Sequence, residues 1–247
     1  MHEGHALSVS VCMATYNGRA FIEEQLDSIL PQLSEYDELV VSDNSSSDGT
    51  WELLLAYQKK DPRIQLFKNE KPGVIGNFEQ AIKMGQKDLI FLCDQDDVWQ
   101  MNKIEVMRSY FQKNPEKTVV VSDLIIVDND FQTLVPSYQA MRHTKSGFWH
   151  NLFRSSYIGA GMAFRKELKS LVLPIPAEVP MHDMWIGLLA DHTKGVAFIP
   201  DKLVYYRRHG LNTTEIKTTA SKWQQFRWRW KAWHLVRKRL RENKKNT

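Results

Sequence analysis

The chain of 247 residues contains only two cysteines, and no stretch approaches the ~18 consecutive apolar residues that a membrane-spanning helix needs. Cys12 and Cys93 each end an apolar run and lack metal-ligand spacing, so we expect both to be buried and reduced. Residues 1–6 lack the basic stretch and apolar core of a secretory signal. These absences argue against a secreted, disulfide-stabilised or membrane-spanning protein and predict a cytoplasmic one.

Two common nucleotide-binding motifs are also missing. Neither G-x-x-x-x-G-K-[ST] nor G-x-G-x-x-G occurs, which argues against a P-loop NTPase and an ordinary dehydrogenase. The composition, with 43% hydrophobic and 25% charged residues, is ordinary for a globular protein. The length allows one large α/β domain, or a domain with an appendage.

The net charge of +4 is distributed unevenly along the chain. Residues 221–247 contain ten Lys and Arg against one acid, Glu242, for a net charge of +9, whereas residues 1–220 carry −5. On a helical wheel of 100° per residue, one set of apolar side chains in this tail falls within about 140°. The set consists of Trp223, Phe226, Trp230, Trp233, Val236 and Leu240. An aromatic and basic amphipathic helix favours the surface of an anionic membrane.

Two other partners for the tail stay open. The apolar stripe could dock on the body of the protein or on a second subunit, which would make a homo-oligomer. The basic face could instead bind nucleic acid, which the sequence favours less.

The first half of the chain alternates apolar strands with amphipathic helices. Strands are expected at residues 7–14, 38–42, 64–68 and 88–93, and helices at 20–33, 48–60, 74–84 and 102–113. This alternation predicts right-handed βαβ units on a parallel sheet. The second half predicts a mixed sheet with long loops suited to ligand contacts. Its expected elements are strands at 118–127, 196–199 and 203–207, a short strand after the Asp128-Asn129-Asp130 turn, and a helix from about Asp183.

Polar residues follow three of the expected strands, where ligands bind in α/β sheets. Three carboxylates, Asp94, Asp96 and Asp97, repel one another unless a cation such as Mg²⁺ or Mn²⁺ neutralises them. The alternative is a solvated turn that caps the following helix. Asp43, directly after an apolar strand, is placed to accept hydrogen bonds from a ribose or a base, while Asp48 could simply cap a helix.

Four motifs occur in order and together carry a family resemblance. They are Ala14-Thr15-Tyr16-Asn17-Gly18, Asp43-Asn44-Ser45-Ser46-Ser47-Asp48-Gly49-Thr50, Gly73-Val74-Ile75-Gly76-Asn77-Phe78 and Asp94-Gln95-Asp96-Asp97-Val98-Trp99. The set resembles the inverting glycosyltransferase family 2 over roughly residues 7–210. The resemblance implies the α/β GT-A fold, a Rossmann-like mixed sheet with helices on both faces, here followed by the basic C-terminal helix. Asp-Gln-Asp-Asp and Tyr206-Arg207-Arg208-His209-Gly210 look most like bacterial rhamnosyltransferases, which use dTDP-rhamnose to build cell-surface polysaccharides.

The resemblance also implies residue roles. Nucleotide binding falls to Thr15, Tyr16, Asn17, Asp43, Asn77 and Asp94. The resemblance assigns Asp96 and His209 as ligands of the cofactor, Mn²⁺ or Mg²⁺. Asp97, Arg207, Arg208 and His182 are expected to be supporting residues of the site. The family's base commonly stands in a Glu-Asp pair, which reads His182-Asp183 here, with Trp185 following as a support. Asp183 is thus the expected base, although a helix N-cap is its rival role.

These inferences predict residues 1–115 as a nucleotide-binding half, 116–220 as an acceptor-binding half and 221–247 as a tail. The expected enzyme transfers a sugar to an acceptor hydroxyl of a lipid-linked bacterial surface glycan, on the inner face of the cell membrane. A UDP-hexose or UDP-N-acetylhexosamine donor is the alternative to dTDP-rhamnose. A non-enzymatic membrane- or nucleic-acid-binding adaptor would explain the tail but leaves the carboxylates without a role. A sugar nucleotidylyltransferase would normally carry a Gly-rich, Arg- and Lys-containing first loop, which is missing here.

Overall fold

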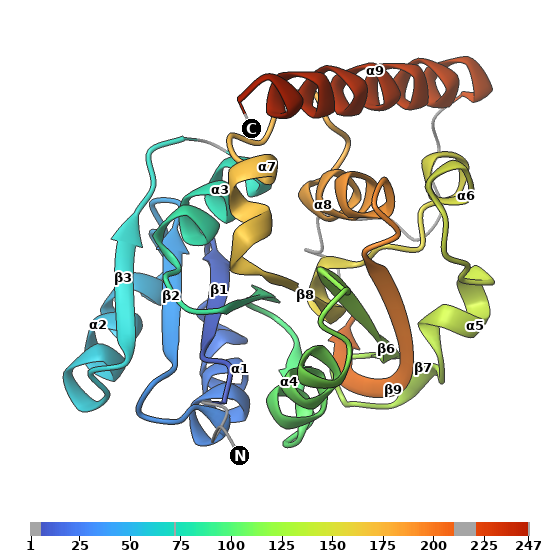
Figure 1. Ribbon diagram of the computed structural model, residues 1–247. Helices are drawn as coiled ribbons and strands as arrows, with labels where there is room; N and C mark the ends of the chain where they lie inside the picture. The colour runs from blue at the N-terminus through green and yellow to red at the C-terminus, as the bar shows by residue number, and fades with distance from the viewer. Residues whose placement is uncertain (1–5, 72, 210–220, 247) are drawn as a thin grey trace.

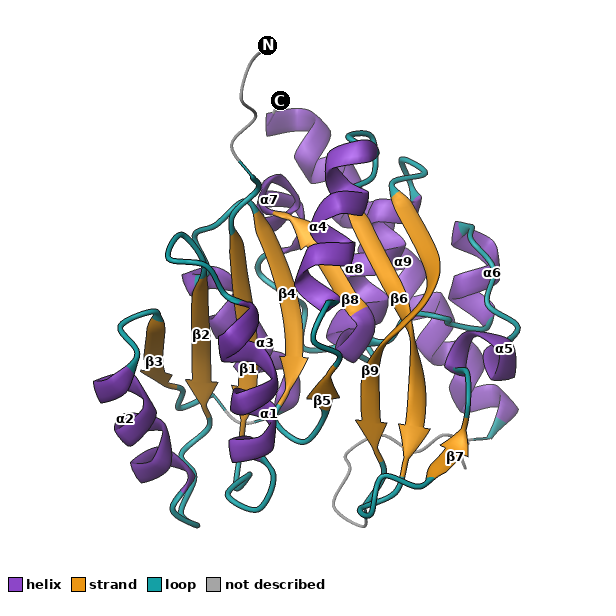
Figure 2. Cartoon of the chain, turned by 90° about the horizontal axis from the view of Figure 1, so that it is seen from below, coloured by secondary structure: helices purple, strands orange, loops and turns teal. Residues whose placement is uncertain are grey.

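The computed structural model describes residues 6–71, 73–209 and 221–246, and its strands form one mixed sheet (Figures 1 and 2). The strand order is β3-β2-β1-β4-β8-β6-β9-β5, and β7 pairs with β6 outside this path. The strands are β1 (Val9–Thr15), β2 (Glu38–Asp43), β3 (Ile64–Lys68), β4 (Leu89–Asp94), β5 (Val98–Trp99), β6 (Val119–Val127), β7 (Thr133–Val135), β8 (Met162–Arg165) and β9 (Val196–Arg207).

Strands β1 to β4 are parallel, as the alternation of strands and helices predicts, whereas β8 runs antiparallel between β4 and β6. The helices are α1 (Ile22–Ile29), α2 (Thr50–Lys60), α3 (Val74–Met84), α4 (Lys103–Lys113), α5 (Tyr138–Arg142), α6 (Phe148–Phe153), α7 (Lys169–Val172), α8 (His182–Asp191) and α9 (Lys222–Asn246). Short 3₁₀ turns lie at Leu30–Gln32, Gly159–Gly161 and Lys166–Leu168.

The helices cover both faces of the sheet because the buried strand residues alternate between two cores. In β1, Val11 and Met13 pack in the core shared with α1, α2 and α4, while Cys12 packs in the core shared with α3 and α8. Both cysteines are free and buried. The mixed α/β fold with helices on both faces and a C-terminal helix is confirmed.

The late strands differ from the sequence-based expectation. Residues 196–199 and 203–207 belong to a single strand, β9, instead of two. The exposed Pro200-Asp201-Lys202 stretch interrupts the apolar pattern, and a shift in register opposite Asp123 lets the pairing with β6 continue. Strand β8 and helices α5 to α7 were not predicted, since each is short and has little periodicity.

Helix α9 packs with one face on the body of the protein (Figure 1). Ala232 and Val236 are buried in the core that includes α8. The guanidinium of Arg239 donates to the carbonyl oxygens of Leu171, Leu173 and Pro174. Within the described residues, no helix is both long and apolar enough to cross a membrane. Thus one face of the predicted tail docks on the body of the chain.

Candidate active site

The register of the parallel strands brings the polar strand ends together. Thr15 at the end of β1 pairs with Asp43 at the end of β2, and Ala14 pairs with Asp94 at the end of β4. The three motifs that the sequence places after strands one, two and four therefore meet at the carboxyl edge of the sheet.

The turn after β1 is held by side chains from the neighbouring loops. Gln95 forms two hydrogen bonds with the backbone of Tyr16, accepting from its N–H at 2.8 Å and donating to its carbonyl at 2.9 Å. Asn17 has a φ of 46° and accepts a hydrogen bond from the backbone of Ser47. A Cβ atom on Gly18 would lie 2.2 Å from Oε1 of Gln95, so a larger residue here would have to displace the Gln95 side chain. Tyr16 itself is left 58% exposed at the mouth of the site.

Asp43 and Asn77 hold this edge of the sheet in place through buried hydrogen bonds. Asp43 is fully buried, and its carboxylate accepts hydrogen bonds from the Thr15 hydroxyl and from both the hydroxyl and N–H of Ser46. Asn77 donates to the carbonyl of Thr15 and accepts from Ser42. Asp43 thus fixes the loop in this structure, and a direct contact between Asp43 and the nucleoside stays a prediction.

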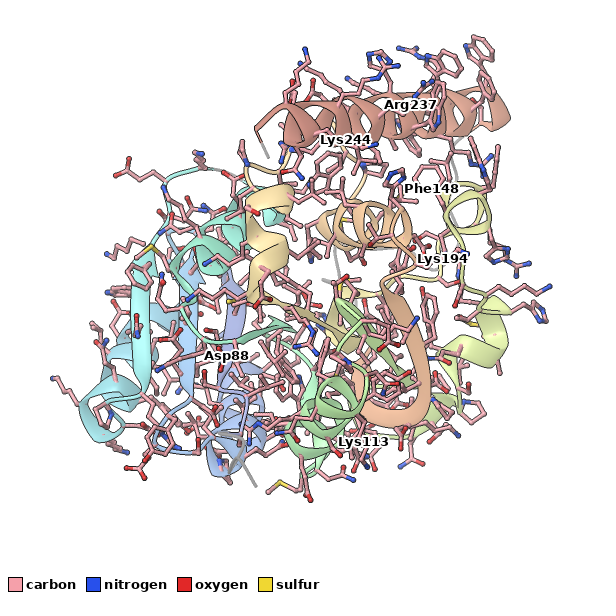
Figure 3. The ribbon with its side chains drawn as sticks, viewed as in Figure 1. Asp88, Lys113, Phe148, Lys194, Arg237 and Lys244 are labelled. Atoms are coloured by element: carbon pink, nitrogen blue, oxygen red, sulfur yellow. The ribbon has the colours of Figure 1, made fainter. Side chains whose placement is uncertain are left out.

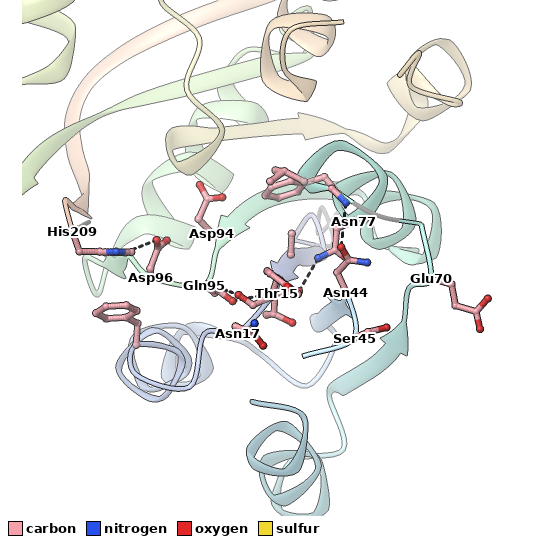
Figure 4. Close-up of a pocket in the computed structure, with 16 residues that line it drawn as sticks. Thr15, Asn17, Asn44, Ser45, Glu70, Asn77, Asp94, Gln95, Asp96 and His209 are labelled. Carbon is pink, nitrogen blue, oxygen red and sulfur yellow. Dashed lines mark hydrogen bonds and ion pairs between the residues drawn. The ribbon is translucent and has the colours of Figure 1, made fainter. Parts of the chain in front are cut away.

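A cavity of about 810 Å³ opens at this edge (Figure 4), within the size range of small-molecule sites. Its walls come from five segments that are far apart in the sequence. The lining residues are Ala14, Thr15, Tyr16, Asn17, Phe21, Asn44, Ser45, Glu70, Gly73, Val74, Asn77, Phe78, Asp94, Gln95, Asp96 and His209. Five of the six predicted nucleotide-binding residues, all except Asp43, therefore line one cavity together with both predicted metal ligands.

The carboxylates after β4 are not a solvated turn. Asp97 is 1% exposed, and burial followed by repulsion from Asp96 and Asp94 raises the pKa of its carboxyl well above the ordinary value. Burial, with the charges of Asp96 and Asp183, raises the pKa of Asp94 to about 7. Asp97 accepts a hydrogen bond from the backbone N–H of Arg207 and so anchors the end of β9. The buried excess of negative charge would be relieved by a cation.

His209 reaches this cluster from the far end of the chain. Its Nε2 lies 2.8 Å from Oδ2 of Asp96, and its ring stacks on Phe21 with a centroid distance of 4.4 Å. Among the described residues, no group of three or more His, Cys, Asp and Glu side chains forms a complete cage. Mg²⁺ is usually held by one or two protein ligands together with substrate phosphates. The Asp96 and His209 pair fits that mode, since it leaves most of the coordination to a phosphate-bearing ligand.

Asp183 lies in the first turn of α8, and its carboxylate is held by backbone donors. Gly159 N–H donates to Oδ2 at 3.1 Å, and Met184 N–H donates to Oδ1 at 2.5 Å. The N-cap position belongs to Met181, so the rival N-cap role for Asp183 is wrong. Asp183 remains partly exposed, while its surroundings raise the pKa of the carboxyl to about 6 through burial. A carboxylate with that pKa is suited to accept a proton near neutral pH.

The other predicted support residues are mostly structural. His182 is buried and stacked on Phe78, and burial lowers the pKa of its imidazole to about 3, which keeps the ring neutral. Trp185 is buried, and its indole N–H donates to the carbonyl of Val172.

The two arginines before His209 belong to strand β9 and its end. Arg207 is buried, forms an ion pair with Glu24, and lies over the ring of Phe21. Arg208 donates its N–H to the carbonyl of Val127. Gly210 of the same motif lies outside the described residues.

Sequence reasoning missed Phe21, Gln95 and Gly159 as parts of the site. Gln95 stands inside the acidic motif, so its place in the sequence could have indicated a role in the site. Phe21, which precedes α1 and stacks on His209, has no such local pattern. Gly159 contacts Asp183 across 24 positions, which sequence spacing does not reveal.

The sequence model described as "Glycosyl transferase family 2" matches residues 10–171 of this chain. A curated relative, the UDP-Glc:alpha-D-GlcNAc-diphosphoundecaprenol beta-1,3-glucosyltransferase WfgD of Escherichia coli, is 36% identical over 107 residues, which cover 43% of this chain and 42% of the relative. The matched segments span between 39% and 59% of the length of these curated relatives.

Two solved structures share the fold. Residues 1–349 of TarS from S. aureus, in complex with UDP-GlcNAc, superpose with a TM-score of 0.68 at 17% identity, covering 94% of this chain and 66% of that one. The mannosyltransferase PcManGT from Pyrobaculum calidifontis, in complex with GDP-Man and Mn²⁺, gives 0.60 at 20% identity, covering 81% and 56%.

Proposed function

The chain belongs to glycosyl transferase family 2, and we propose that it moves a sugar from a nucleotide-sugar donor to an acceptor hydroxyl with inversion at the anomeric carbon. One observation carries the proposal. Asp96 and His209, 113 positions apart in sequence, come within 2.8 Å at the wall of a cavity also lined by Thr15, Asn77 and Asp94. A cavity of this size and polarity suits a nucleoside diphosphate.

The donor half of the proposed site comes from residues 1–115. Thr15, Tyr16, Asn17 and Asn77 line the cavity and are proposed to contact the nucleoside, and Asp94, which also lines it, is proposed to contact ribose or phosphate. Asp96 and His209 would hold Mn²⁺ or Mg²⁺, which offsets the negative charge of the diphosphate leaving group when bound.

The acceptor half comes from residues 116–220, which include Asp183. In the proposed reaction the acceptor oxygen attacks the anomeric carbon while its proton passes to the Asp183 carboxylate. The bond from the anomeric carbon to the donor oxygen breaks, and the nucleoside diphosphate leaves with the electron pair. Gly159 and Met184 keep the receiving oxygens in place through their N–H groups.

Two donors are proposed for the reaction. The Asp-Gln-Asp-Asp and Tyr-Arg-Arg-His-Gly motifs favour dTDP-rhamnose as the donor. The names of the relatives favour a UDP-sugar, because one uses UDP-Glc and another was solved with UDP-GlcNAc. With either donor, Asp96 and His209 are the proposed metal ligands and Asp183 is the proposed base.

The acceptor is proposed to be a lipid-linked glycan at the inner face of the bacterial cell membrane. The diphosphoundecaprenol acceptor in the name of the Escherichia coli relative supports this class. The outward face of α9 supports a membrane location, because Trp223, Phe226 and Trp230 are exposed beside the cations Arg227 and Lys231. Trp233, which the sequence assigns to the same stripe, is partly buried against the body.

The role of Asp183 is tested by Asp183→Asn. The amide cannot accept the proton, so transfer should fall by about 10²–10⁴-fold while binding of the nucleoside diphosphate stays unchanged. Asp201→Asn, at an exposed position of β9, is the matched control and should retain full transfer. Transfer retained by Asp183→Asn would overturn the assignment of the base.

A further inference from the structure

The exposed tryptophans gather at one end of the molecule. Four tryptophans are exposed among the described residues, and they lie on only two elements, α6 and α9. They are Trp149 at 61%, Trp223 at 69%, Trp228 at 42% and Trp230 at 58% exposure. Phe153, the last residue of α6, is 53% exposed as well. Large aromatic side chains gathered in solvent on neighbouring elements are typical of an interaction surface.

The two elements adjoin, which brings the exposed Phe153 of α6 next to α9. Helix α6 packs beside the N-terminal half of α9 (Figure 1), and the guanidinium of Arg229 lies 5.7 Å from the ring centroid of Phe153. On a helical wheel of 100° per residue, Phe226 lies about 60° from Arg229. The side of the exposed stripe that holds Phe226 is therefore next to the side of α9 that contacts α6. Phe148, the first residue of α6, is partly buried and packs against the core that contains Val236 (Figure 3).

The chain segment that contains α6 is basic, as α9 is. Residues 136–157, which include α5 and α6, contain no Asp or Glu but include the cations Arg142, Lys145 and Arg154. Farther along the outward face of α9 come His234, Arg237, Lys238, Arg241 and Lys245, with Glu242 as the one acid (Figure 3 labels Arg237 and Lys244). Tryptophan prefers the headgroup region of a bilayer, and each cation near an anionic surface adds attraction.

We propose that α6 and the N-terminal half of α9 form a single membrane-binding surface, in which Trp149 and Phe153 enter the interface of an anionic bilayer beside Trp223, Phe226 and Trp230. The proposal extends the membrane location proposed above from one helix to two, and it rests on that part of the proposed function. A second helix fixes the orientation of the protein on the membrane, because one helix alone leaves the body free to rotate about the helix axis.

This orientation has a consequence for the acceptor. Gly159 follows Phe153 by six positions, so their Cα atoms are at most about 20 Å apart even when the chain is fully extended. Gly159 holds the carboxylate of Asp183. The surface therefore keeps the acceptor side of the site within reach of a hydroxyl carried on a lipid anchored in the same bilayer.

The test is cosedimentation of the full chain with phosphatidylcholine vesicles containing about 30 mol% phosphatidylglycerol. We expect Trp149→Ala combined with Phe153→Ala to weaken vesicle binding by about tenfold or more, since burial of two aromatic side chains is lost. Tyr36→Ala, which removes a 69% exposed aromatic residue on the loop before β2, is the matched control and should bind like the unchanged chain. Both altered positions are exposed, so the fold should persist, as thermal unfolding would verify.

Two outcomes would overturn the proposal. Vesicle binding unchanged in the α6 double variant but lost in Trp223→Ala with Trp230→Ala would confine the membrane contact to α9. A shift from dimer to monomer in the α6 variant, with vesicle binding unchanged, would assign α6 to a second copy of the chain. Nucleotide release from the donor, measured without vesicles, reports the proposed enzyme separately, so its failure is distinguishable from failure of the surface.

Discussion

Nζ of Lys103 donates a hydrogen bond of 2.6 Å to the carbonyl oxygen of Ala160, inside the core and behind the acidic turn. Lys103 is fully buried and lies 3.8 Å from the ring centroid of Trp99. Ala160 follows Gly159, whose N–H holds Asp183. One buried side chain thus links the helix after the acidic turn to the backbone that positions the proposed base.

Lys103→Met should therefore weaken both the fold and the reaction. The carbonyl of Ala160 would lose its buried donor, which costs about 2 kcal/mol and lowers Tm by about 5 °C. Displacement of Gly159 should also lower kcat by about tenfold or more, with less effect on KM for the donor. Lys113→Met, at the exposed end of α4, is the control. A variant with unchanged Tm and kcat would contradict this link.

The transfer rate should fall at acid pH. Burial raises the pKa of Asp183 to about 6, and only its carboxylate form accepts a proton. The kcat/KM for the acceptor should thus be level above about pH 6 and decline about tenfold per pH unit below it. A profile that stays flat down to about pH 4.5 would show that no group with this pKa limits the reaction.

Phe21 should affect the affinity for the cation indirectly, by positioning His209. Its ring stacks on His209, and residues that orient a metal ligand typically change metal affinity by 10–100-fold when replaced. We expect Phe21→Ala to raise the Mn²⁺ concentration for half-maximal activity by about tenfold or more. Tyr36→Ala is the control for loss of an aromatic side chain. An unchanged midpoint would mean that the stacking does not position His209.

Gly18 and Gln95 should behave as a coupled pair. A Cβ on Gly18 would lie 2.2 Å from Oε1 of Gln95, which is held by two hydrogen bonds to Tyr16. Gly18→Ala should thus weaken nucleotide binding by about tenfold, whereas in a Gln95→Ala background it should add little. Calorimetric titration with nucleoside diphosphates measures both. Fully additive effects would show that the clash does not matter.

The sequence predicts what depends on local pattern and misses what depends on distant contacts. Asp94, Asp96 and Asp97 directly follow an apolar run, so their place at the sheet edge follows from strand topology. The approach of His209 to Asp96 across 113 positions has no spacing signal and was inferred only from the family resemblance.

Other parts of the structure show the same limit. Strand β8 was missed because four residues are too few to show alternation. The tail was predicted as an amphipathic helix, but the division between its docked and exposed faces depends on how Ala232 and Val236 meet α8.

The most direct measurement of the central claim is release of nucleoside diphosphate from a panel of dTDP-, UDP- and GDP-sugars, with Mn²⁺, with Mg²⁺ and with neither, for the unchanged chain and for Asp96→Ala. The account predicts cation-dependent release from one donor class, either dTDP-rhamnose or a UDP-sugar, and its loss in Asp96→Ala. Absence of binding to every nucleotide-sugar, together with vesicle or nucleic-acid binding, would contradict the account and favour a non-enzymatic adaptor.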